Sequence, residues 1–126
     1  MNYILIAGTI IVNLALLFYT IAFVIFYRMH KLSGKLLLFF SLGLVFDIAA
    51  TCFMIAGSTN SPFTIHGFVG YSALLTMTIE VILIWRLYIN YGLDVSLPTK
   101  VHRYTVFAYI WWILAYITGA LLAALN

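Results

Sequence analysis

Two acidic residues lie deep inside apolar runs of this sequence, and their side chains are the strongest candidates for chemistry. Asp47 follows Lys35 by 12 residues, about 18 Å along a helix, and Glu80 precedes Asn90 by ten residues. A carboxylate at the centre of a bilayer costs about 2.5–3.5 kcal/mol on insertion scales, so such groups usually face the protein interior and have a partner there. We therefore expect both side chains to point inward near mid-membrane depth.

Helical spacing predicts which residues accompany the two acids. In each apolar run the polar residues recur at steps of three and four, so they share one face of a helix. These faces should point at the axis of a bundle. They consist of Thr9, Asn13, Thr20 and Tyr27; of Gly43, Asp47, Ala50, Thr51 and Met54; of His66, Gly70, Ala73, Met77 and Glu80; and of His102, Thr105, Tyr109, Ile113 and Tyr116.

Asn13, Asp47, Glu80 and Tyr116 should then lie at roughly one depth. This grouping has two readings, and the sequence leaves both open. The four side chains could be a hydrogen-bonded set that holds the bundle together. They could instead form a proton or ion relay, or the polar wall of a ligand cavity. Two acids are more than cohesion of a four-helix bundle needs, which keeps the second reading open.

The chain has three histidines, all near the ends of apolar runs. A lone histidine at a membrane interface is most often a polar residue at a helix end, but facing helices of a bundle also bind cofactors. Haem takes axial ligands such as His or Met, and often basic groups for its propionates. His30 and His102 could form an axial pair near the cytoplasmic face, with Arg86 and Arg103 beside the propionates.

A second haem position is conceivable in the outer half of the bundle. His66 could ligate the iron there, and Met54 lies at a similar depth as its partner. No CxxCH motif is present, so the expected cofactor is non-covalent haem b. Without an HExxH motif or a His/Cys cluster, we expect no metal other than the haem iron. No Ser or Cys lies in a strand–turn–helix setting, so an enzyme with such a nucleophile is not favoured.

The composition requires a membrane around these residues. Of 126 residues, 66% are hydrophobic and 7% are charged, and a small soluble domain could not bury so much apolar surface. Runs of about 20 apolar residues cross a hydrocarbon core of about 30 Å as α-helices. We therefore predict an all-α membrane protein, a single domain with an antiparallel up-down-up-down bundle of four transmembrane helices. The expected helices are approximately 3–27, 35–57, 63–89 and 104–125.

Basic residues predict the orientation of this bundle. The connections between successive helices are called joints here, numbered along the chain. All six basic residues lie at or near the first and third joints: Arg28, Lys31, Lys35, Arg86, Lys100 and Arg103. The positive-inside rule predicts that those joints lie in the cytoplasm and that both termini lie on the non-cytoplasmic side. The expected location is the cell membrane, which the chain crosses several times. The basic residues behind the net charge of +3 lie at the ends of apolar runs and do not form a patch in the sequence. Nucleic acid is therefore not an expected partner.

A ridge of small residues marks the last helix. Ala115, Gly119 and Ala123 recur at steps of four, which lets two helix backbones approach closely. The ridge could meet another helix of the same bundle, which we favour, or a second copy of the chain in a homodimer.

Several short motifs follow one another from the second apolar run to the end of the chain. They are Phe46-Asp47 with Thr51 and Met54, then His66-Gly67-x-x-Gly70 with Ala73 and Met77, then His102-Arg103-Tyr104 leading to Trp112 and Ala115-Tyr116-x-x-Gly119. In this order they resemble the small membrane proteins of bacterial HsmA-type haem-sensing systems. The resemblance implies a four-helix protein that binds haem. Such a protein would sequester or sense haem and limit haem-driven oxidative stress.

The resemblance also implies roles for particular residues. His66 and His102 correspond to haem-contacting positions, and Asp47 to a buried polar support. The family pattern often has a histidine near position 80, where this chain has Glu80. A glutamate does not give the axial ligation that histidine gives a low-spin haem, so this chain would bind haem differently or bind another ligand.

Two other functions fit the same residues. A transmembrane b-type electron carrier would place haems near His66 and His102, although three histidines cannot supply two bis-histidine haems. A proton-coupled transporter of small molecules would use Asp47 and Glu80 as its titrating groups.

Overall fold

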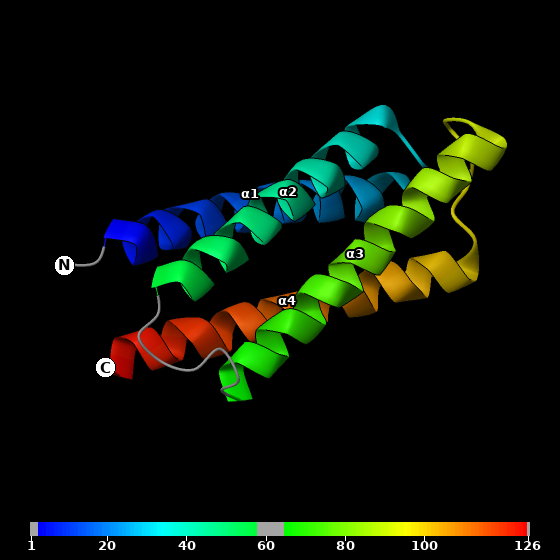
Figure 1. The fold of residues 1–126 in the computed structure, drawn as a ribbon. Helices are drawn as coiled ribbons and strands as arrows, with labels where there is room; N and C mark the ends of the chain where they lie inside the picture. The colour runs from blue at the N-terminus through cyan, green and yellow to red at the C-terminus, as the bar shows by residue number, and fades with distance from the viewer. Residues whose placement is uncertain (1–2, 58–64, 126) are drawn as a thin grey trace.

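The chain consists of four long helices in a computed structural model that describes residues 3–57 and 65–125 (Figure 1). Each contains a segment of 23 to 25 residues that is apolar and long enough to cross a membrane. The prediction of four such helices is confirmed. The helices are α1 Tyr3–Met29, α2 Gly34–Gly57, α3 Ile65–Tyr91 and α4 Thr99–Leu125.

Local signals explain where these helices begin and end. Ser33 caps α2, since its hydroxyl accepts a hydrogen bond of 3.1 Å from the backbone N–H of Leu36. Gly92 ends α3 with φ of 79°, a left-handed conformation that costs glycine little. His30 ends α1 in the same way, with φ of 53°.

The last helix begins earlier than the apolar pattern predicts. It starts at Thr99 instead of residue 104, directly after Pro98, whose carbonyl accepts the backbone N–H of His102. The prediction counted apolar residues and left out Lys100 and Arg103. A helix does not have to end where the hydrocarbon ends, because its backbone hydrogen bonds are equally good in the polar interface. The predicted start of the third helix, at residue 63, lies outside the described residues.

Two connecting loops pair with each other at one end of the molecule. Lys31 and Ser96 form an isolated antiparallel bridge. On one side of it the backbone N–H of Leu32 donates to the carbonyl of Val95, and on the other side the N–H of Leu97 donates to the carbonyl of His30. The start of α1 and the end of α4 lie at the opposite end (Figure 1). The first and third joints, which carry the basic residues, are therefore held together as one surface, which we call the basic end.

Helices α1 and α2 pack most closely, and a glycine makes this approach achievable. The ring of Tyr19 lies directly over Gly43, where an added Cβ would be 2.5 Å from the ring. The Tyr19 ring occupies the space that a side chain at position 43 would fill. The glycine therefore lets the two helices pack closely at this point.

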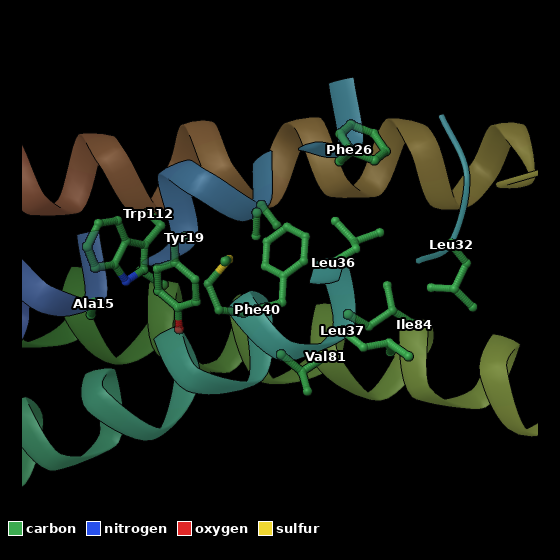
Figure 2. Packing of buried hydrophobic residues seen from close by; sticks show 14 of the residues in the cluster. Ala15, Tyr19, Phe26, Leu32, Leu36, Leu37, Phe40, Val81, Ile84 and Trp112 are labelled. Carbon is green, nitrogen blue, oxygen red and sulfur yellow. The ribbon is translucent and has the colours of Figure 1, made fainter. Parts of the chain in front are cut away.

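The buried core combines residues from all four helices (Figure 2). On α1 it consists of Ala15, Tyr19, Ala22 and Phe26, all fully buried. The predicted inward face of this helix holds only in part: Thr9, Asn13 and Thr20 lie to one side of these residues, and Tyr27 is 61% exposed. Small and aromatic residues fill the close contact between α1 and α2. The polar side chains of Thr20 and Asn13 instead form hydrogen bonds with α4. The predicted faces of α2 and α4 are buried or half-buried, as are the described positions of the face on α3.

Large apolar side chains cover the outside of all four helices. Examples are Leu17, Val45, Leu75 and Phe107, each at least half exposed. Exposed apolar surface of this extent is what lipid requires and water does not tolerate. The chain is thus a multi-pass membrane protein.

Candidate functional site

Asp47 is held by two side chains, Tyr19 and Trp112, that the sequence did not identify as its partners. The hydroxyl of Tyr19 donates to Asp47 Oδ2 at 3.0 Å, and the indole Nε1 of Trp112 donates to the same oxygen at 2.9 Å. The two rings meet edge to face with centroids 5.0 Å apart. The carboxyl group, on a residue that is 5% exposed, therefore joins α1, α2 and α4.

A cavity of about 300 Å³ opens beside this carboxyl group. All four helices contribute to its wall, which combines a carboxylate, an amide and hydroxyls with a thioether and several small residues. Its volume lies at the lower end of the range of about 300–1,000 Å³ found for small-molecule sites. The lining residues are Thr9, Val12, Asn13, Asp47, Thr51, Met54, Gly70, Ala73, Trp112, Ala115, Tyr116, Gly119 and Ala120.

The wall between α1 and α4 is ordered by polar and aromatic contacts. Tyr116 donates from its hydroxyl to the side-chain carbonyl of Asn13, whose amide donates in turn to the backbone carbonyl of Thr9. The rings of Tyr116 and Trp112 stack with centroids 5.8 Å apart. Three of the residues expected at one depth, Asn13, Asp47 and Tyr116, do line one cavity.

Glu80 does not belong to this group, so the prediction of one shared depth is wrong for it. Its Oε1 accepts a hydrogen bond of 2.6 Å from Thr105, which precedes Trp112 by seven residues, about 10 Å along α4. Its neighbour Val81 lies beside Leu37, away from Trp112 (Figure 2). The prediction counted residues from each helix end, but α3 crosses the bundle obliquely, so equal counts do not give equal depths (Figure 1).

His30 and His102 come together at the basic end. Their ring centroids are 5.4 Å apart and their planes differ by 37°. His102 also packs on Phe26, at 4.8 Å between centroids. Two imidazoles on one iron, with metal–nitrogen bonds of about 2 Å, hold their ring centroids about 6 Å apart with the macrocycle between them. The two imidazoles are thus near each other, and the axial pair stays a prediction. Arg86 and Arg103 are both exposed.

The other predicted haem ligands belong to the cavity end. Met54 lines the cavity. His66 lies in the first turn of α3, four residues before Gly70 and thus on the helical face that lines the cavity, but its side chain lies outside the described residues.

The small-residue ridge of α4 faces the same cavity. Ala115 is 6% exposed, and both it and Gly119 line the wall. The side chain of Ala123 lies outside the described residues. Within the described part of the ridge, the small residues border the interior of the bundle, and the homodimer stays a prediction.

Sequence reasoning missed Tyr19, the donor from α1. One signal could have found it: Tyr19 is the one tyrosine in the middle of the first apolar run, far from either interface. A phenol at that depth needs an acceptor inside the protein, and Asp47 is one of two carboxylates at such depth.

Comparison with known proteins gives no match: no protein-family model, no curated protein and no solved structure is similar to this chain.

Proposed function

We propose that this chain is an integral membrane haem-binding protein whose site is the cavity beside Asp47. The observation that carries the proposal is that four helices build one cavity with an ordered polar wall, at the level of the motifs that resemble haem-sensing proteins. Positive-inside orientation puts the basic end in the cytoplasm, so the cavity belongs to the outer half of the membrane and both termini face outward.

The cavity wall combines small residues, which could pack against one edge of a planar apolar ligand, with a side chain that could bind iron. Gly70, Ala73, Ala115 and Gly119 leave flat surfaces on α3 and α4, and Met54 supplies a thioether that is an established type of axial ligand. His66 begins the face of α3 that continues through Gly70. Haem, when bound, would supply the iron chemistry; the protein would keep it away from lipid and peroxide. No basic side chain lines the described wall, so the propionates would remain at the mouth of the cavity.

The test is the visible spectrum of protein purified from a haem-supplied host. We expect a Soret band that His66→Ala and Met54→Ala weaken or shift. His30→Ala and Met29→Ala are the matched controls, because both residues are exposed outside the cavity, and the band should not change. A band that is insensitive to the first pair, or lost in His30→Ala, would refute this ligand assignment.

The number of histidines does not favour a b-type electron carrier. A carrier with two bis-histidine haems needs four histidines, and the chain has three.

A transporter is favoured by one observation, the location of Asp47 in the wall of an accessible cavity. Glu80 lies away from that cavity, so coupling would depend on Asp47. Uptake or export by proteoliposomes that stops in Asp47→Asn but continues in Glu80→Gln would support this second function over haem binding.

A further inference from the structure

Glu80 is a buried carboxyl group that the proposed cavity does not use. The residue is fully buried, and Thr105 donates to its Oε1 at 2.6 Å. Its Oε2 is also buried and has no hydrogen-bond partner among the described residues. An ionised carboxylate with an unpaired oxygen is among the most expensive groups to hold in a membrane, so this oxygen needs a ligand.

No cation from a neighbouring element reaches this carboxyl group within the described part of the chain. On α1, the hydroxyl of Tyr19 is committed to Asp47, and on α4 the hydroxyl of Tyr104 donates to the backbone carbonyl of Thr76. Arg86, six residues further along α3, is exposed. The core residues that α2 contributes toward this end, among them Leu36, Leu37 and Phe40, are apolar.

His102 lies on α4 between Thr105, the partner of Glu80, and the basic end. Thr105 follows His102 by three residues, so the two share a face of α4 about 4.5 Å apart along its axis. His102 is half-buried and contacts the ring of His30, which is exposed. Imidazoles take up and release protons near neutral pH, which suits them to pass protons between water and a buried group.

We propose that Glu80 is a proton-binding site that is loaded from the basic end through His30 and His102. A proton from water binds an imidazole, passes along the pair and ends on Oε2, while the Thr105 hydroxyl continues to donate to Oε1. Uptake neutralises the carboxylate and release restores it, so no other reactant is needed. A metal ion is a poorer occupant, because hard cations take six or more oxygen ligands and Glu80 has one hydrogen-bonding neighbour.

The chain offers an unusually clean test, because Glu80 is its only glutamate. Protein labelled with ¹³C at glutamate side chains gives a single carboxyl signal in infrared and NMR spectra. In lipid nanodiscs we expect this signal to be that of the protonated acid at pH 6, where a free glutamate, with a pKa of about 4.3, is almost fully ionised. A signal of the ionised form at pH 6, or one that NaCl shifts at constant pH, would overturn the proposal.

The path is tested by the rate at which the same signal responds to a pH jump. His102→Gln and His30→Gln should slow this response about tenfold or more, since they remove the relaying imidazoles. The final spectra should stay unchanged. Lys35→Gln, which removes a basic residue but no imidazole, should leave the rate unchanged and serves as the control. Equal rates in all three variants and the wild type would refute the path. Haem binding plays no part in either measurement, so their outcome is independent of the proposed function.

Discussion

The indole of Trp112 donates a hydrogen bond of 2.9 Å to the carboxyl group of Asp47, across 65 residues of sequence. This contact joins α4 to α2 beside the cavity, and both residues line its wall. The carboxyl group of Asp47 thus lines the cavity and also holds two helices together. Changes to Asp47 should therefore affect stability and ligand binding together.

Replacement of Asp47 should show how much its hydrogen bonds stabilise the fold. Asp47→Ala leaves the hydroxyl of Tyr19 and the indole of Trp112 without their acceptor, and we expect a loss of about 1–3 kcal/mol in the free energy of unfolding. Asp47→Asn keeps an oxygen for both donors and should cost less than half as much. Unfolding in detergent, followed by tryptophan fluorescence, measures both. Equal losses would contradict the hydrogen-bonded role.

Gly43 should be intolerant of a side chain. In Gly43→Ala the new Cβ would be 2.5 Å from the ring of Tyr19, so α1 and α2 must move apart, at a cost of about 1–3 kcal/mol. Gly70→Ala is the matched control, because nothing lies within 4 Å of its added Cβ and alanine favours a helix. The same unfolding measurement should show a loss for the first variant and none for the second; the reverse order would be inconsistent with the close α1–α2 contact.

Much of the fold could be predicted from hydropathy alone, and the reason is physical. A helix in lipid must satisfy its own backbone, so the apolar length of each run predicts a spanning helix. The start of α4 was placed five residues too late, at 104 instead of Thr99, because hydropathy reports where hydrocarbon ends, not where hydrogen bonding ends.

The site was predicted only in part. Asn13, Asp47, Met54 and Tyr116 line one cavity as polar faces of helices predict. Glu80 was misplaced, since depth depends on the angle at which helices cross, and no single-helix pattern contains that angle. The role of Tyr19 was missed for a similar reason, because its partner lies 28 residues away on another helix.

Filling the cavity should weaken ligand binding without unfolding the protein. Gly119→Leu adds a large side chain to the wall, and we expect the affinity for haem to fall about tenfold or more, equivalent to about 1.4 kcal/mol. Ala56→Leu adds the same kind of side chain on the exposed surface of α2 and is the control. Haem titration followed by absorbance measures both; unchanged affinity in Gly119→Leu would place the site elsewhere.

The proposed orientation predicts which loops are accessible from outside the cell. In a Cys52→Ser background, a cysteine introduced at Ser96, in the loop of the basic end, should not react with a membrane-impermeant thiol reagent on intact cells. A cysteine at Ser61, in the second joint, should react. Opening the cells should expose the first site. Labelling of Ser96→Cys on intact cells, without labelling of Ser61→Cys, would reverse the orientation.

The most direct test of the central claim is the haem content of the wild-type protein, purified in mild detergent from a haem-supplied host. The account predicts a Soret band with one haem per chain, retained in His30→Ala and lost or weakened in Gly119→Leu. A protein that carries no haem under these conditions and shows no Soret shift on titration with haem would contradict it.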